Sequence, residues 1–357
     1  MTESKLRAWW AHRQGLDGSM HGKAPAQILE RSGWSRSVGG AGPYLTLFSR
    51  GATSREAADN AAANLEIHEL PTARGCTYVL PATDFALGLT VGRDFSGDMK
   101  TALKLGVTEK EIDTLCEAVV EALGRGPLDP DGIREATGKA SRSLGEEGKK
   151  KGLTTTLPLA LGRLQTEGRI RRVPVNGRLD QQRYRYVNWT PNPLATYPAA
   201  LGTAFTELGR RFFGWVGPAT LGEFQWFSGL GVKAAKQAVE PLGLVPAEPG
   251  SDRMLLPDDV AAFTAFEAAT TPRYALVSSL DPITANRREM RSLIDDSDRK
   301  RAVMVDATSK PLGGLADLPS HAILDRGQII GLWEFDPDSA TIVWAISGVL
   351  SALAVVL

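Results

Sequence analysis

The sequence is poor in the residues that hold metal ions or build disulfide frameworks. Its 357 residues include only two cysteines, Cys76 and Cys116, and four histidines. The cysteines lie far apart and the histidines form no HExxH or HxH pair, so neither a disulfide framework nor a catalytic metal site is predicted. We therefore expect no metal and no cofactor. Two unpaired thiols also suit the reducing environment of the cytoplasm.

The sequence also lacks net charge, because Lys and Arg together number 41 and so do Asp and Glu. Only a local cluster of charge can therefore indicate a polyanionic partner. Between residues 139 and 185, twelve basic residues stand against four acidic ones, a local excess of +8. Side chains that neutralise phosphates release counterions, which gives salt-dependent binding to DNA. The residues predicted to contact double-stranded DNA are Lys149, Lys150, Lys151, Arg169, Arg171, Arg172, Arg178 and Arg183; the alternative is a solvated basic surface.

Long hydrophobic runs are scarce. The N-terminal segment has no apolar core of a signal peptide. A nearly uncharged, apolar stretch of 17 residues ends the sequence at 341–357, whereas a membrane-spanning helix needs about 20. We expect a buried strand and helix at this end of the chain, with a tail anchor as the alternative, and no membrane partner.

The pattern of helix and strand signals predicts an α+β protein with tandem winged-helix domains and a C-terminal β-rich segment. In the second domain, helical periodicity is followed by strand, Asn176-Gly177 and strand, which is the signal of a hairpin and hence of a wing. Tight glycine turns between short helices indicate another helix-turn-helix further along. The expected domains are 1–126, 127–190, 198–262 and 263–357.

A glycine-rich loop lies in the stretch GWSRSVGGAGPYLTLFSR, residues 33–50. A phosphate-binding P-loop would need Lys-Ser or Lys-Thr after the glycines, and a dinucleotide fingerprint would need a preceding buried strand. Pro43 follows Gly42 instead, and neither requirement is met. ATP and NAD are therefore not expected as ligands.

Several motifs in register resemble those of the AlkZ-type (YcaQ-type) winged-helix DNA glycosylases. They are the GPAT-centred segment 210–230, the Leu-Asp-Pro segment 276–303, the hairpin AILDRGQIIGLWEF at 322–335 and the Arg-Gly segment 74–81. The likeness spans about residues 10–335. It implies three winged-helix units around a DNA channel, and hydrolysis of the N-glycosidic bond of an alkylated or crosslinked base. We expect a monomer that associates with the nucleoid.

The catalytic motif of that family is missing here. Relatives carry Gln-x-Gln or Gln-x-Asp shortly before a helix that residues 43–50, PYLTLFSR, match. The two polar positions fall near Arg36 and Val38, and no Gln or Asp occurs from residue 33 to 50. A valine side chain cannot orient water or stabilise a cation, so other groups must do this work if the protein is an enzyme.

Four residues are the candidates for that replacement. Glu69 could orient water or stabilise charge on the sugar, and His68 could transfer a proton. Arg36 and Ser37 could hold a phosphate or a carbonyl of the substrate. The structural alternatives are ion pairs at a helix end for Glu69 and a surface turn for Arg36 and Ser37.

Other residues near these motifs also have two interpretations. Trp9, Trp10, Trp34 and Tyr44 could stack on a base, but aromatic residues in helices commonly pack in a core. Asp281 of the Leu-Asp-Pro segment is predicted to be a turn or cap residue.

Three hypotheses on function remain open. The first is a DNA glycosylase with a non-standard site. The second is a protein of the same fold that only recognises damaged DNA, and the third is a pocket that binds a small genotoxic molecule. The basic hairpin favours the first two.

Overall fold

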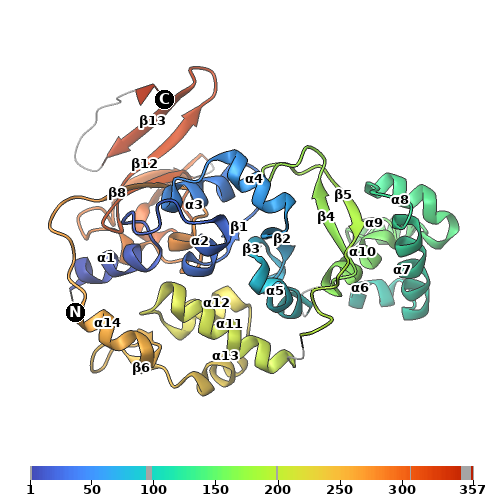
Figure 1. The fold of residues 1–357 in the computed structure, drawn as a ribbon, viewed down its shortest axis with the longest axis horizontal. Coiled ribbons are helices and arrows are strands. Elements are labelled where there is room, and N and C mark those ends of the chain that lie inside the picture. The colour runs from blue at the N-terminus through green and yellow to red at the C-terminus, as the bar shows by residue number, and fades with distance from the viewer. Residues whose placement is uncertain (1, 94–98, 198–199, 306, 347–354, 357) are drawn as a thin grey trace.

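The computed structural model describes residues 2–93, 99–197, 200–305, 307–346 and 355–356. Three helical units, each with a small strand pairing, are followed by a C-terminal sheet (Figure 1). The first unit occupies the middle of Figure 1, the second its right-hand end and the third the lower part, while the C-terminal strands rise at the upper left.

The first unit consists of helices packed on a small antiparallel sheet. Helices α2 (Pro25–Ser32), α3 (Gly42–Gly51) and α4 (Arg55–Ala63) pack on strands β1 (Ser35–Arg36), β2 (Ile67–Pro71) and β3 (Thr77–Pro81), and α5 (Phe85–Gly92) follows. The antiparallel sheet has the order β1-β3-β2. Ser54 caps α4 by accepting a hydrogen bond from the Ala57 amide, as its residue type favours.

The second unit contains α6 (Met99–Lys104), α7 (Glu109–Leu123), α8 (Pro130–Thr137), α9 (Gly145–Lys150), α10 (Leu157–Thr166) and the hairpin β4 (Ile170–Pro174) and β5 (Tyr184–Asn188). Thr108 and Glu111 form a capping box at the start of α7. The apolar face of α7 packs in one core with α8, α10 and both hairpin strands. Helix α7, which precedes the predicted boundary at residue 126, thus shares its core with the second unit.

The β4–β5 hairpin does not project freely as a wing. Its strands are joined by residues 175–183 instead of the tight Asn176-Gly177 turn alone. Leu179 is buried in the core of the first unit, and its amide donates to the Tyr44 hydroxyl at 2.8 Å. The amide of Gly40 also donates to the carbonyl of Asp180 at 3.3 Å. The tip of the hairpin thus docks on the first unit.

The third unit consists of α11 (Leu201–Val216), α12 (Leu221–Ser228), α13 (Val232–Val239), strands β6 (Val245–Pro246) and β7 (Met254–Leu255), and α14 (Val260–Ala265). A capping box of Thr220 and Glu223 starts α12. Its core is aromatic, with Phe212, Phe213, Phe224 and Phe227 in mutual ring contacts.

The C-terminal part is β-rich, as predicted. Strands β8 (Tyr274–Val277), β11 (His321–Asp325), β12 (Gln328–Asp336), β13 (Thr341–Ile346) and β14 (Val355–Val356) form an antiparallel sheet in the order β14-β13-β12-β11-β8, beside a pair β9 (Ala302–Val305) and β10 (Thr308–Pro311). Arg326 and Gly327 both have positive φ, as a two-residue hairpin turn requires.

The predicted C-terminal strand is present, but it is not buried. Strand β13 is partly exposed along its length, and the helix expected after it falls on residues 347–354 and 357, outside the described part of the chain. Among the described residues, no helix combines the length and the apolar character that a membrane crossing requires.

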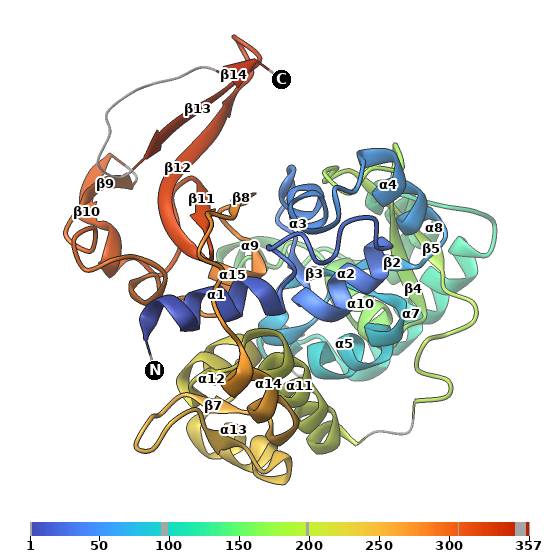
Figure 2. The ribbon, with the colours of Figure 1, turned by 60° about the vertical axis from the view of Figure 1, so that its left-hand side comes forward.

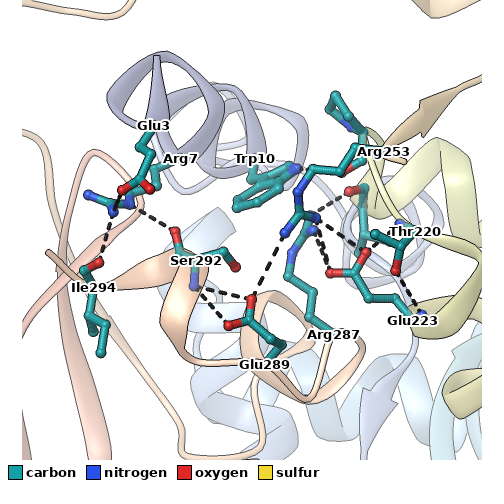
Figure 3. Close-up of polar contacts among 12 residues, drawn as sticks. Glu3, Arg7, Trp10, Thr220, Glu223, Arg253, Arg287, Glu289, Ser292 and Ile294 are labelled. Atoms are coloured by element: carbon teal, nitrogen blue, oxygen red, sulfur yellow. Dashed lines mark hydrogen bonds and ion pairs between the residues drawn. The ribbon is translucent and has the colours of Figure 1, made fainter. Parts of the chain in front are cut away.

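Helix α1 (Glu3–Arg13) joins the third unit to the C-terminal part, and it lies between them in both ribbon views (Figure 2). Trp10 is fully buried, with the guanidinium of Arg287 at 3.5 Å from its ring (Figure 3). Burial lowers the pKa of Arg287 to about 9, although Glu223 at 3.5 Å favours its charge. Trp9 and Trp34 are also buried. The hypothesis that these tryptophans stack on a base is therefore wrong.

A second buried ion pair joins the first unit to the C-terminal sheet. Arg50, at the end of α3, donates to both carboxylate oxygens of Asp281 at 2.7 and 2.8 Å, and both side chains are fully buried. Asp281 also accepts from the Ile283 amide at the start of the short helix α15 (Pro282–Ala285). The prediction of a cap at Asp281 is confirmed, and we call this contact the Arg50–Asp281 joint.

Candidate active site

A cavity of about 360 Å³ lies where the first unit meets the β4–β5 hairpin. The first unit supplies residues 36–39, Glu69 and residues 75–77, and the hairpin supplies Arg172, Gln181, Gln182 and Tyr184. We call this cavity the Glu69 pocket. It lies at the glycine-rich loop, where the resemblance places the catalytic motif of relatives.

Glu69 is the acidic residue of this pocket. Its side chain lies on β2 and is 25% exposed, so the carboxylate can be reached from the cavity. The Ser37 hydroxyl donates to Oε2 at 2.8 Å. Burial raises the pKa of Glu69, while the bond from Ser37 and the charge of Arg172 act in the opposite direction. Ser37 thus fixes one oxygen of a carboxylate in a partly desolvated place.

The other oxygen of Glu69 is less constrained. Oε1 lies 3.9 Å from Nη1 of Arg172, which is beyond hydrogen-bond distance. Within the described ranges of the chain, no group donates a hydrogen bond to it. Its lone pairs are therefore available to a water molecule or a substrate.

Two arginines hold their guanidinium groups over aromatic rings in this pocket. Arg36 of β1 lies 5.3 Å from the Tyr78 ring, and Arg172 of β4 lies 4.4 Å from the Tyr184 ring. Such contacts restrain the position of a cation. Nη1 of Arg36 and Nε of Arg172 are buried, and neither has a hydrogen-bond partner among the residues that the structure describes.

The glycine-rich loop forms one side of the pocket. The side-chain amide of Gln182 donates to the carbonyl of Val38 at 2.7 Å, and Val38 itself is 52% exposed at the rim. Gly39 has φ +87°, and a Cβ at this position would collide with the Gln182 amide. The glycines therefore allow the hairpin to approach the loop closely.

His68 is not part of the pocket. It precedes Glu69 on β2, and successive side chains of a strand face opposite sides. Its ring is buried against Phe85 and Trp189, with centroids 6.0 and 5.4 Å away. Burial lowers the pKa of His68 to about 3, and the charges of Arg171 and Arg172 add to this. The predicted proton-transfer role is not supported, because the imidazole is neutral and enclosed by the core.

The eight predicted DNA-binding residues fall into separate groups. Arg172 lines the pocket, and burial lowers the pKa of Arg171, which is only partly exposed. Arg169 pairs with Glu117, and Arg178 pairs with Asp180. Lys149, Lys150, Lys151 and Arg183 are exposed, although Lys150 pairs with Glu147 at 2.8 Å.

Sequence reasoning missed two features of the site. Nothing in the local pattern indicated that Tyr184 and Gln182 would face the first unit, because their partners lie more than a hundred residues earlier. The only local signal was the glycine-rich loop at 39–42, because glycine permits a close approach of another segment to the backbone. No cluster of three or more potential metal ligands occurs in the described part of the chain.

Comparisons with known proteins agree with this architecture. A model of the family described as AlkZ-like DNA glycosylases matches residues 36–353. The structure is similar to that of the Streptomyces sahachiroi DNA glycosylase AlkZ, with a TM-score of 0.74 and 17% sequence identity over 99% of this chain and 92% of that chain. A search of curated proteins finds no match. The predicted resemblance and the α+β fold class are confirmed.

Proposed function

Because this chain belongs to the AlkZ-like DNA glycosylase family, we propose that it hydrolyses the N-glycosidic bond of an alkylated or crosslinked base, with Glu69 in place of the missing Gln-x-Gln or Gln-x-Asp pair. The observation that carries the proposal is the contact of Ser37 with Glu69 at 2.8 Å, inside a cavity at the motif position.

Glu69 has the properties that the reaction needs. As the bond between sugar and base breaks, positive charge develops on the sugar, and a fixed carboxylate in a partly water-excluded site stabilises that charge. The bond from Ser37 fixes Oε2, which leaves Oε1 to orient the attacking water. Arg36 and Arg172 face the same cavity and hold the base or an adjacent phosphate.

Binding to double-stranded DNA is assigned to the exposed lysine and arginine side chains of the second unit. Lys149 and Lys150 lie at the end of α9, Lys151 follows it, and Arg183 lies next to the hairpin strand β5. Arg169 and Arg178 are each paired with a carboxylate, as are Lys149 and Lys150, so these four residues must exchange a carboxylate for a phosphate. A monomer acting on DNA would be found with the nucleoid in the cytoplasm.

Release of a damaged base from duplex DNA tests the proposal. The substrate is a duplex treated with an alkylating agent, with the enzyme in excess, and free bases are separated and quantified. Glu69→Gln keeps the size of the side chain and removes its charge, so we expect release to slow about 10²- to 10³-fold. Glu66→Gln is the matched control, because Glu66 is exposed and does not line the pocket.

Two results would count against the proposal. The first is no base release by the wild-type protein at high enzyme excess. The second is release by Glu69→Gln at the wild-type rate. In either case Glu69 does not act in base excision.

A role in damage recognition without catalysis is the second candidate. The observation that favours it is the charge of Arg172 near Glu69, which partly neutralises the carboxylate. This alternative predicts tight binding to alkylated DNA with no base release. Selective binding of a free genotoxin in the 360 Å³ cavity, with no DNA binding, would favour the small-molecule alternative.

A further inference from the structure

A stack of three side chains lies beside the Glu69 pocket. The guanidinium of Arg74 is 3.3 Å from the centroid of the Trp226 ring, and that of Arg288 is 3.6 Å from it. One face of an indole has no room for two guanidinium groups at such distances, so the two cations cover opposite faces. Nη2 of Arg74 also lies 3.7 Å from the sulfur of Cys76, which lines the pocket. We call Arg74, Trp226 and Arg288 the Trp226 stack.

The members of the Trp226 stack come from three parts of the fold. Arg74 lies between β2 and β3 of the first unit, Trp226 lies on α12 of the third unit, and Arg288 follows α15. Arg74 and Arg288 both have positive φ, of 60° and 53°, which a residue other than glycine adopts only at a cost in free energy. The tertiary structure thus holds both cations on the indole against the preference of the local backbone.

A structural arginine of this protein has a different environment. Arg287 also stacks on a tryptophan, Trp10, but it is buried and pairs with Glu223 at 3.5 Å (Figure 3). Arg74 and Arg288 are both partly exposed. The two cations of the Trp226 stack can therefore be reached from the solvent.

The charges of the Trp226 stack are poorly compensated. Arg74 meets no carboxylate in the part of the chain that the structure describes. Besides the sulfur of Cys76, its guanidinium reaches the carbonyl of Trp226, in a long contact of 3.5 Å. Arg288 lies 3.4 Å from Asp317, whose side chain is 49% exposed. Because ion pairs between exposed groups are weak, an incoming anion can replace Asp317.

We propose that the Trp226 stack binds the phosphate backbone of the DNA strand whose damaged nucleotide enters the Glu69 pocket. The planar fork of a guanidinium matches the oxygen atoms of a phosphate, and stacking on the indole restrains its position. Two cations held apart by an indole suit a polyanion with regularly spaced charges. A nucleotide that leaves the duplex needs its backbone held near the pocket. This inference rests on the proposed function and assigns it a DNA contact.

Binding of an abasic analogue tests the proposal without any base release. The probe is a duplex with a tetrahydrofuran residue at its centre, and an undamaged duplex of the same sequence is the reference. Both are titrated at several salt concentrations. Arg74→Gln and Arg288→Gln should each weaken binding of the probe about tenfold and lower the slope of log K against log salt by about 0.9 in magnitude. Binding of the undamaged duplex should change much less and keep its slope.

Further variants separate a phosphate contact from a structural role. Arg74→Lys keeps the charge and should retain the salt slope, while it loses the planar fork and part of the affinity. Trp226→Leu keeps both cations and should weaken probe binding, because the cations lose their platform. Arg13→Gln is the matched control and should change neither quantity, because Arg13 also lies over a tryptophan but is paired with both carboxylate oxygens of Asp259.

Thermal unfolding shows which variants are folded. Where Arg74→Gln or Arg288→Gln is not folded, Arg74→Gly or Arg288→Gly takes its place. Glycine removes the charge and adopts the positive φ of these two positions without strain. The same titrations are then made with the glycine variants, for which we expect the same loss of affinity and slope.

The outcomes distinguish this inference from the proposed function. Unchanged affinity and salt slope in the folded variants would show that the Trp226 stack only joins three parts of the fold, and this overturns the inference. Equal losses for the probe and the undamaged duplex also overturn it, as does a wild-type protein that does not bind the probe. If the variants lose affinity for the probe but the wild type releases no base, the hydrolysis proposal fails while the assignment of the stack stands.

Discussion

The stretch from Arg36 to Arg50 begins at the Glu69 pocket and ends at the Arg50–Asp281 joint, and these two places treat charge differently. At the joint, both carboxylate oxygens of Asp281 meet the guanidinium of Arg50, and both residues are fully buried. In the pocket, Oε1 of Glu69 accepts no hydrogen bond within the described part of the chain, and its ion-pair partner, Nη1 of Arg172, lies 3.9 Å away. A closely matched charge pair holds the domains together at the joint, whereas the loosely paired carboxylate of the pocket stays open to the cavity.

Removing one partner of the Arg50–Asp281 joint should have the largest effect on stability. Arg50→Met or Asp281→Leu leaves the other charge buried and unpaired, which should cost about 3–5 kcal/mol in the free energy of unfolding. The double variant removes both charges and should recover much of that loss. Urea denaturation of the four proteins measures this cycle. Single changes that cost less than the double change would show that the pair is not a structural unit.

The next largest effect is the pH dependence of stability caused by His68, which lies on the face of strand β2 opposite to Glu69. The pKa of His68 is lowered to about 3 in the folded protein, against 6.5 for the free side chain. Below pH 6.5 the unfolded state therefore binds a proton that the folded state does not. The contribution of His68 to stability is present above pH 6.5 and declines by about 1.4 kcal/mol per pH unit below it.

His68→Leu should remove this part of the pH dependence. Urea denaturation at pH 7 and pH 5 compares the variant with the wild type, so that the other titrating groups cancel. If the wild type and His68→Leu lose the same amount of stability between pH 7 and pH 5, the imidazole of His68 is not held neutral in the core. Glu69→Gln, on the opposite face, should leave the His68-dependent slope in place.

Substitutions at two neighbouring glycines test how the glycine-rich loop contacts the hairpin at the wall of the Glu69 pocket. Gly39 and Gly40 both have positive φ, but only at Gly39 would a Cβ meet another residue, the Gln182 side chain. Gly39→Ala should cost about 1–2 kcal/mol and detach the hairpin from the loop, whereas Gly40→Ala should cost about 1 kcal/mol through backbone strain alone. Urea denaturation, with Tyr184 replaced by Trp as a fluorescent reporter of the hairpin, compares the two. Identical behaviour would contradict a specific role for Gly39.

The exposed lysines of α9 give the smallest effect on stability. A triple substitution to Gln, at Lys149, Lys150 and Lys151, should alter the free energy of unfolding by less than about 0.5 kcal/mol. If all three contact phosphates, the slope of log K against log salt should fall by up to about 2.7 in magnitude. DNA binding at several salt concentrations measures this slope. An unchanged slope would show that α9 does not face DNA.

Much of the fold followed from local patterns. The capping box at Thr108 and Glu111, the hairpin turn at Arg326 and Gly327 and the stop of β3 at Pro81 depend on neighbouring residues, so the sequence indicates them directly. The apolar face of α7 does not reveal which core it joins, so the sequence alone could not show that this helix packs with the second unit. Likewise, Trp9 and Trp10 could be assigned to the core only when their surroundings were known.

The sequence by itself determined the class of fold, the likeness to a glycosylase family and the loss of the usual catalytic pair near Arg36 and Val38. Only the tertiary structure decided what lies in their place. Ser37 follows strand β1, Glu69 lies on strand β2 of the same sheet, and Arg172 reaches them from another unit. No local sequence pattern predicts that these three residues lie together, because their proximity depends on how the β4–β5 hairpin packs against the glycine-rich loop. The same packing separated Glu69 from His68, because adjacent residues of a strand face opposite sides of it.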